Sequence, residues 1–289
     1  MTPNPTPNPN PTPHEPPPSR SIVVTGGGRG LGWEMAEALV AAGHRVLITG
    51  AREAGELDAA AARLNAGAGE PRALAMVADV SDWDACQAVA ARCLQAWGRI
   101  DGLVNNAGRG MLEISDDFVR RPPLFWQADP GGFRNIIEAN VTGAFLMARA
   151  CVPTMVSQGF GRVVNISTSR PTMVRVGYSP YGPSKAALEA MSVVWAKDLQ
   201  DTGVTVNVLL PGGASDTRLV PDSGGFRRGA DGNLLPPSLM RAPIVWLMGH
   251  AGAEVNGERY IARQWRTDQP WDRAAAGARD ERHDVPAVM

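Results

Sequence analysis

Cysteine is scarce in this sequence, and its scarcity limits both the fold class and the compartment. Only Cys86, Cys93 and Cys151 occur among 289 residues, and no two of them form a C-x-x-C pair. Because an odd number of cysteines cannot pair completely, a disulfide-stabilised secreted fold is not expected. We predict free thiols in a reducing compartment, and therefore a cytoplasmic protein.

Histidine is also rare, and neither sign of charge is in excess. The four histidines lie far apart in the sequence without partners at metal-ligand spacing, so no metal site is predicted. Lysine and arginine number 28 against 29 aspartates and glutamates, which leaves a formal net charge of -1. This balance does not favour nucleic acid or an anionic membrane as a partner.

Long apolar runs are missing as well. No stretch reaches the ~18 apolar residues that a membrane-spanning helix needs, and the N-terminus lacks the apolar run of a secretory signal. Nine of the first eighteen residues are proline, so residues 1–19 are predicted to be a disordered tail. Hydrophobic residues still make up 44% of the chain, which is enough to form a buried core in the remainder.

A glycine-rich turn is the first feature that indicates a function. A β-branched run over residues 22–25 precedes it, and apolar residues recur at helical spacing over residues 31–42 after it. Glycines between a strand and a helix let the backbone turn sharply and approach a phosphate, next to the free N–H groups of the helix N-terminus. Rather than a purely structural turn, we predict a dinucleotide site, with these cofactor-binding residues: Gly26, Gly28, Arg29, Gly30, Leu31 and Gly32.

The second predicted strand, residues 45–49, indicates which dinucleotide is preferred. The acidic residue that would bind a ribose 2′-hydroxyl is missing from its end, and Arg52 follows the strand instead. Arg52, together with Arg29 in the glycine turn, suits a 2′-phosphate. NADP(H) is therefore favoured and NAD(H) stays open, since Glu53 directly after Arg52 weakens the preference.

Polar residues follow two further predicted strands. Residues 73–77 form the third strand, and Asp79 and Val80 at its carboxyl end are placed to meet the adenine. The fourth strand begins at residue 102 and ends in an Asn-Asn-Ala-Gly sequence at residues 105–108. Later strands are expected at residues 162–166, 204–210 and 260–262, so strands alternate with helices and predict a doubly wound α/β sheet.

Tyr181 and Lys185 form a candidate acid/base pair. If residues 181–185 form the start of a helix, the side chains of Tyr181 and Lys185 lie on one face, at positions i and i+4. A neighbouring ammonium favours the phenolate and could bring the Tyr181 proton into use near neutral pH. An isolated Y-x-x-x-K match more often marks a half-buried tyrosine and a solvated lysine, so the pair gains weight only from the other motifs.

Together these motifs resemble the short-chain dehydrogenase/reductase family. They are T-G-x-x-x-G-x-G at residues 25–32, D-V at 79–80, N-N-A-G at 105–108 and Y-x-x-x-K at 181–185. The resemblance covers roughly residues 20–265 and leaves the N-terminal tail and the C-terminal residues 266–289 outside. It implies a single-domain, three-layer Rossmann fold with a seven-stranded parallel sheet. It further implies hydride transfer between a nicotinamide and a carbonyl or secondary alcohol.

The resemblance also implies the roles of particular residues. Tyr181 would exchange the proton, Lys185 would bind the nicotinamide ribose, and Asn140 would support proton exchange with solvent. The catalytic serine of the family falls on Thr168 here, thirteen residues before the tyrosine, so Thr168 is the first choice for the catalytic hydroxyl and Ser167 the second. Further cofactor contacts are implied for Asn106, Ala107, Gly108, Pro211, Gly212 and Thr217.

Two regions and two rival functions stay open. Residues 109–139 are about ten longer than the family leads us to expect, and they are predicted either to line the substrate pocket or to form a surface insertion. The rivals are a non-catalytic nucleotide-binding regulator and an epimerase or dehydratase that uses the same tyrosine and lysine. A small-molecule substrate and a homo-oligomer, dimer or tetramer, are expected, whereas the substrate itself cannot be named from the sequence.

Overall fold

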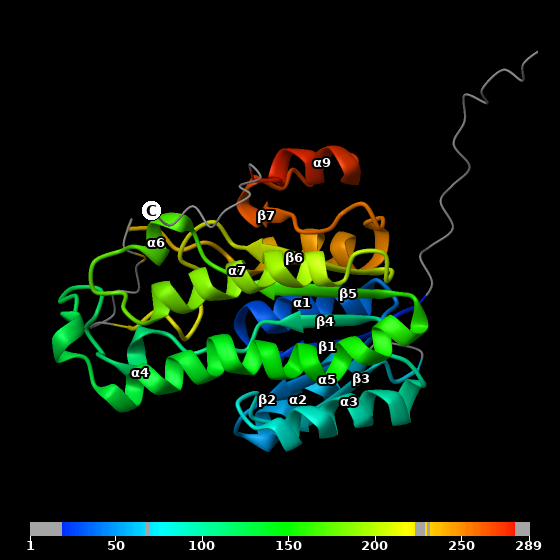
Figure 1. Cartoon of the computed structure of the whole chain (residues 1–289), viewed down its shortest axis with the longest axis horizontal. Helices are drawn as coiled ribbons and strands as arrows, with labels where there is room; N and C mark the ends of the chain where they lie inside the picture. The colour runs from blue at the N-terminus through cyan, green and yellow to red at the C-terminus, as the bar shows by residue number, and fades with distance from the viewer. Residues whose placement is uncertain (1–18, 67–69, 223–228, 230–231, 281–289) are drawn as a thin grey trace, which may run out of the picture.

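Parallel strands form the centre of the molecule (Figure 1). The computed structural model describes residues 19–66, 70–222, 229 and 232–280, so the predicted disorder of the N-terminal tail lies almost wholly outside the described residues. The seven strands are β1 (Ser21–Thr25), β2 (Arg45–Gly50), β3 (Ala73–Val77), β4 (Gly102–Asn105), β5 (Gly161–Ile166), β6 (Val204–Leu210) and β7 (Arg259–Ile261).

The strand order is β3-β2-β1-β4-β5-β6-β7, and every pairing is parallel. The order reverses between β1 and β4, where open α/β sheets bind ligands beyond the carboxyl ends of their strands. The predicted seven-stranded Rossmann fold is confirmed. Its main helices are α1 (Gly30–Ala41), α2 (Ala54–Asn65), α3 (Trp83–Trp97), α4 (Pro130–Ile137), α5 (Gly143–Gln158), α6 (Arg170–Met173), α7 (Tyr181–Asp198), α8 (Arg241–Val245) and α9 (Trp271–Ala278).

Helices cover both faces of the sheet. Each strand contributes to both interfaces because alternate residues point to opposite sides. Ile22 and Val24 of β1 pack in a core cluster with α1, α2, α8 and α9. Val23 between them packs in a second cluster with residues of α3, α5 and α7. In Figure 1, α5 and α7 cross the front of the sheet and α1 lies behind it. Strands buried on both faces explain the continuous apolar runs in the sequence.

The helical region that follows the long loop after β4 is not a regular α-helix throughout. α4 is followed by a π-helical turn, Glu138–Thr142, and only then by α5. Such π turns are rare and frequently lie at functional sites. Asn140 is buried within this turn, so the irregularity lies where a site residue is predicted.

The segment after Trp265, which the resemblance leaves outside the domain, contributes to the core. α9 buries Ala274, Ala275 and Ala278, and all three belong to the cluster beneath α1 and α8. Among the described residues, no helix is long and apolar enough to cross a membrane. The three cysteines are buried and free, as predicted.

Candidate active site

The glycine turn is tied to the end of β4. Thr25 Oγ1 accepts hydrogen bonds from the backbone N–H groups of Asn106 (3.0 Å) and Ala107 (2.9 Å). The Asn106 side chain donates in return to the carbonyl oxygens of Thr25 (2.8 Å) and Gly26 (3.1 Å). A methyl group on Gly32 would lie 2.1 Å from the Gly26 oxygen, so only glycine lets α1 start this close to the turn. The glycine turn at residues 25–32 and the Asn-Asn-Ala-Gly sequence at residues 105–108 therefore form one structural unit.

The segment after β6 lies over the same turn. A methyl group on Gly30 would lie 3.2 Å from Cγ2 of Thr217, and Gly30 has a positive φ of 54°. Pro211 and Gly212, which lead to Thr217, are buried. No described side chain caps the N-terminus of α1, so its free N–H groups are left for another acceptor. The residues present fit the pyrophosphate of a dinucleotide.

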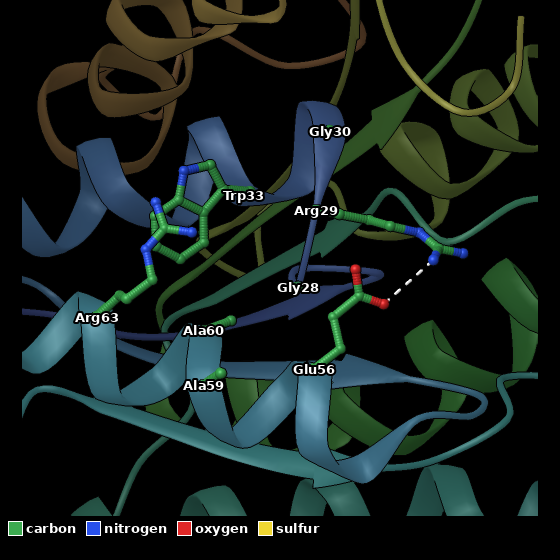
Figure 2. Close-up of a pocket in the computed structure, with 8 residues that line it drawn as sticks. All are labelled: Gly28, Arg29, Gly30, Trp33, Glu56, Ala59, Ala60 and Arg63. Atoms are coloured by element: carbon green, nitrogen blue, oxygen red, sulfur yellow. Dashed lines mark hydrogen bonds and ion pairs between the residues drawn. The ribbon is translucent and has the colours of Figure 1, made fainter.

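Arg29 lies at the outer end of this turn and is bound by carboxylates. Its Nη1 is 3.2 Å from Glu56 and 3.8 Å from Glu53, while Arg52 is exposed. A cleft of about 380 Å³ lies here. Figure 2 shows Arg29 and Glu56 facing each other in it. Arg63 covers the ring of Trp33 on the other side of the cleft, 4.2 Å from the ring centroid. Any phosphate bound by Arg29 therefore competes with these carboxylates.

Asp79 and Val80 follow β3, at the carboxyl ends of the strands, where the glycine turn also lies. Asp79 Oδ1 accepts hydrogen bonds from Ser81 N (3.0 Å) and Ser81 Oγ (2.7 Å). Burial works to raise the pKa of Asp79, but the Ser81 bonds and the charges of Arg109 and Arg52 lower it below its usual value. Asp79 is thus an ionised acceptor that suits an amino group such as that of adenine.

Tyr181 is the first residue of α7, as the sequence predicts, and Lys185 follows one turn later. The side chain of Thr168 lies beside the Tyr181 hydroxyl, close enough to act on its pKa. Burial raises the pKa of Tyr181 to about 12, the Thr168 side chain lowers it, and nearby Tyr178 raises it. A buried phenol with this pKa holds its proton at neutral pH and can donate it.

Ser167 and Thr168, the two candidates for the catalytic hydroxyl, have different partners. Ser167 Oγ donates a 2.6 Å hydrogen bond to Glu189 Oε1, whereas the Thr168 side chain lies beside Tyr181. A hydroxyl that acts on the substrate oxygen must share that oxygen with the tyrosine. This geometry favours Thr168, and the role itself stays a prediction.

Lys185 is buried and contacts the sheet. Its Nζ donates to the carbonyl oxygen of Ile166 at 2.8 Å. Burial lowers the pKa of Lys185 to about 8, and the carboxylate of Glu189 works against this effect. The pKa of Tyr181 is set here by burial, Thr168 and Tyr178. The lowering of that pKa by Lys185 therefore stays a prediction for the cofactor-bound enzyme.

Asn140 connects the β4 loop to α7. Its Oδ1 accepts from Arg109 N (2.8 Å), and its Nδ2 donates to Arg109 O (3.0 Å) and Ser184 Oγ (2.9 Å). A methyl group on Gly108 would lie 2.9 Å from Asn140 Oδ1 and 3.8 Å from Lys185 Nζ. The predicted residues Gly108, Asn140 and Lys185 thus converge on one point, although they come from three motifs.

The segment 109–139 packs beside the tyrosine. Its residues Met111, Phe118 and Ile136 form a small apolar cluster against which Tyr178 and Tyr181 pack. The rings of Phe118 and Tyr178 meet edge to face, with centroids 5.6 Å apart. Leu124, Phe125 and Trp126 are instead exposed, so the aromatic pair of this segment does not face the core. The segment therefore borders the site through its first and last parts.

Sequence reasoning missed two charged residues behind the site, Glu189 and Arg259. Glu189 binds Ser167, and Arg259 Nη2 donates to the carbonyl oxygen of Thr168 at 2.9 Å. The only signal for Glu189 was its position four residues after Lys185 on the same helix face. Arg259 lies 91 residues from Thr168, and no local pattern indicates that contact.

A doubly wound sheet with a glycine turn and an uncapped helix N-terminus at the carboxyl ends of its strands is typical of dinucleotide-binding proteins. Comparison with known proteins identifies the family. The family described as short chain dehydrogenase matches residues 20–224. The 3-oxoacyl-[acyl-carrier-protein] reductase of Synechocystis sp. is 34% identical over 190 residues, which are 66% of this chain and 72% of that protein. The acetoacetyl-CoA reductase of Rhizobium meliloti is 34% identical over 206 residues, which are 71% of this chain and 78% of that protein.

A solved structure agrees with these relatives. A short chain dehydrogenase from Burkholderia cenocepacia J2315, in complex with NADP, superposes with a TM-score of 0.70 at 28% identity. The match covers 83% of this chain and 94% of that chain. The chain belongs to the short-chain dehydrogenase/reductase family. It is an NAD(P)-dependent oxidoreductase that acts on carbonyl or alcohol substrates.

Proposed function

We propose that the protein is an NADP(H)-preferring reductase of ketones or aldehydes that also oxidises the corresponding alcohols, with Tyr181 as its acid/base. The observation that carries this proposal is the placement of Tyr181 on α7 beside the Thr168 side chain and one helical turn before the buried Lys185. A proton donor, a second hydroxyl and a cation thus meet at the edge where the cofactor residues lie.

The nicotinamide, when bound, supplies or accepts the hydride. Thr168 holds the substrate oxygen by its hydroxyl, and Tyr181 delivers its proton to that oxygen in reduction or takes it in oxidation. Lys185 binds the ribose hydroxyls and stabilises the phenolate that remains after proton transfer. Asn140 supports the return of a proton from solvent. The apolar cluster of segment 109–139 packs against Tyr181 and would keep water from that side of it.

The preference for NADP(H) rests on the arginines at the outer end of the glycine turn. Arg29 and Arg52 are expected to lie near the adenosine ribose of the bound cofactor, and Arg52 is close enough to influence Asp79. Solved relatives in complex with NADP support the same preference. Arg52→Ala is expected to weaken NADPH binding by about tenfold while leaving NADH binding within about twofold. Fluorescence titration with both cofactors measures this, and an unchanged preference would exclude Arg52 as the reader of the phosphate.

The substrate class is tested with a panel of carbonyl compounds. Because two relatives are named as reductases of 3-oxoacyl and acetoacetyl thioesters, the panel should contain acetoacetyl-CoA beside simple ketones and aldehydes. Consumption of NADPH is followed by absorbance. Turnover with at least one carbonyl compound is expected. Cofactor binding without turnover across the panel would instead favour a non-catalytic nucleotide-binding protein.

A homo-oligomer, dimer or tetramer, belongs to this proposal. Phe145 and Val156 of α5 and Val194 of α7 expose large apolar side chains on the outer layer of helices. Such exposed side chains suit contact with a second copy. Light scattering after gel filtration tests the oligomeric state, and a monomer at micromolar concentration would contradict this part of the proposal. The cytoplasmic location stays a prediction.

A further inference from the structure

Three partly buried charges lie behind the turn that carries Ser167 and Thr168. They are Glu189 of α7, Arg259 of β7 and Asp280 just after α9, with side chains exposed by 18%, 12% and 16%. Charges this far from water are costly unless they are paired. We call these three residues the charge triad. The reaction proposed above does not use them.

Arg259 joins the triad through its guanidinium group. Its Nε donates to both carboxylate oxygens of Glu189, at 3.0 and 3.1 Å, and its Nη1 pairs with Asp280. Its Nη2 donates to the carbonyl oxygen of Thr168 at 2.9 Å. Because the guanidinium is planar and rigid, these contacts fix one another's positions.

The triad holds two successive residues of the site. Glu189 accepts the hydrogen bond of Ser167 Oγ, and Arg259 binds the carbonyl of Thr168. The side chain of Ser167 and the backbone carbonyl of Thr168 are therefore both held in place. Together these contacts fix the position of the Thr168 hydroxyl. Since that hydroxyl lies beside Tyr181, a shift of the turn would separate the two reacting groups.

We propose that Arg259 is a positioning residue, held by Glu189 and Asp280, that keeps the Thr168 hydroxyl against Tyr181 and holds the Glu189 carboxylate one helical turn after Lys185. This inference rests on the proposed roles of Tyr181 and Thr168. It makes Asp280, just after α9, part of the support of the active site.

The contacts of Asp280 attach the C-terminal segment, here residues 271–280, to the active-site support. Asp280 N donates to the carbonyl of Arg259 at 2.8 Å, so backbone and side chain both attach this segment to β7. Arg170, at the start of α6, forms an ion pair with Asp280 at 3.3 Å. The segment is thus joined to β7 and to the loop that follows Thr168. Its loss would release Arg259 from one of its two carboxylates.

Steady-state kinetics test the positioning role with Arg259→Gln and Asp280→Asn. Asp268→Asn is the matched control, because Asp268 is an exposed C-terminal acid paired with an arginine at 2.8 Å. We expect kcat to fall about ten- to hundredfold in Arg259→Gln and less in Asp280→Asn, since a shift of the reacting groups has costs of this size. NADPH affinity, from fluorescence titration of the same proteins, should stay within about twofold in all three. Wild-type kcat in Arg259→Gln would overturn the proposal.

A second readout does not depend on turnover. The chain contains two lysines, Lys185 and Lys197, so ¹⁵N-lysine NMR gives two side-chain signals that Lys197→Arg assigns. The carboxylate of Glu189 raises the pKa of Lys185, so Glu189→Gln should lower that pKa further below about 8. Simple loosening of the site would admit water and raise the pKa toward its ordinary value.

These measurements distinguish failure of the positioning role from failure of the proposed function. If the wild-type protein reduces no carbonyl compound, the proposed function fails, and the lysine titration still decides whether Glu189 acts on Lys185. A pKa of Lys185 that is unchanged or raised in Glu189→Gln would overturn that role. If Arg259→Gln does not fold, Asp280→Asn carries the kinetic test, and wild-type kcat there overturns the positioning role.

Discussion

Thr168 is the residue at which this chain departs from the serine of its family. A threonine hydroxyl keeps the hydrogen-bond donor and adds a methyl group that narrows the space for the substrate. This hydroxyl lies beside the proton donor Tyr181, whereas Ser167 is bound to Glu189. At this scale the identity of the catalytic hydroxyl is the first question for experiment.

Substitution of the two hydroxyl residues answers it. Thr168→Val keeps the shape and removes the donor, so kcat should fall by about 10²–10³-fold, the cost of losing one donor to the developing oxyanion. Thr168→Ser keeps the donor and should stay within about tenfold of the wild type. Ser167→Ala is the comparison. A larger loss of kcat in Ser167→Ala than in Thr168→Val would transfer the role to Ser167.

Glu56 is the residue that restrains the cofactor arginine. It lies 3.2 Å from Arg29 and 3.5 Å from Arg218, so it competes with a 2′-phosphate for positive charge. Glu56→Gln should therefore tighten NADPH binding by about two- to fivefold, the range expected for an exposed ion pair. NADH binding should change less. Glu70→Gln, which removes another exposed acid paired with an arginine, is the control, and equal effects of the two changes would contradict the competition.

At the scale of elements, α9 connects the C-terminal segment to both the core and the charge triad. Ala275 is buried on this helix and its neighbour Ala276 is exposed, which gives a matched pair of sites. Ala275→Asn should lower the free energy of unfolding by about 2 kcal/mol, because it buries an unpaired amide. Ala276→Asn should cost less than about 0.7 kcal/mol, the difference in helix propensity. Urea unfolding measures both, and equal losses would mean that α9 is not packed as described.

The elements also show what the sequence can and cannot predict. β6 and the start of α7 were predictable because an apolar run and a helical spacing are local signals. The glycine turn was predictable because the backbone itself demands glycine at Gly26 and Gly32. The π turn around Asn140 and the partners of Arg259 were not, because both depend on packing between segments far apart in the sequence. The same holds for the choice between Ser167 and Thr168, which only their partners distinguish.

At the scale of the whole molecule, the carboxyl ends of the strands carry the candidate active site, and a buried histidine lies near their amino ends. This residue, His44, is fully buried, and its Nδ1 accepts a hydrogen bond from Arg20 N at 3.3 Å. Burial first, and then the charge of Arg20, lowers the pKa of His44 to about 4. Between about pH 4 and 6.5 the unfolded chain therefore binds a proton that the folded chain does not.

This difference predicts a loss of stability in acid. The contribution of His44 is present above pH 6.5 and is lost as the pH falls toward 4, by up to about 3 kcal/mol. His44→Gln should flatten the decline of the unfolding free energy between pH 7 and 4.5, measured by urea unfolding. An equal decline in the wild type and the variant would show that His44 is not the group responsible.

The central claim concerns the proton that Tyr181 exchanges with the substrate oxygen, and Tyr181→Phe tests it most directly. NADPH consumption is measured with the best carbonyl substrate of the panel, and NADPH affinity is measured on the same protein. We predict that kcat falls by about 10²–10⁴-fold, the usual worth of a positioned acid, while NADPH binding stays within a few-fold. Turnover at the wild-type rate in Tyr181→Phe would contradict the account.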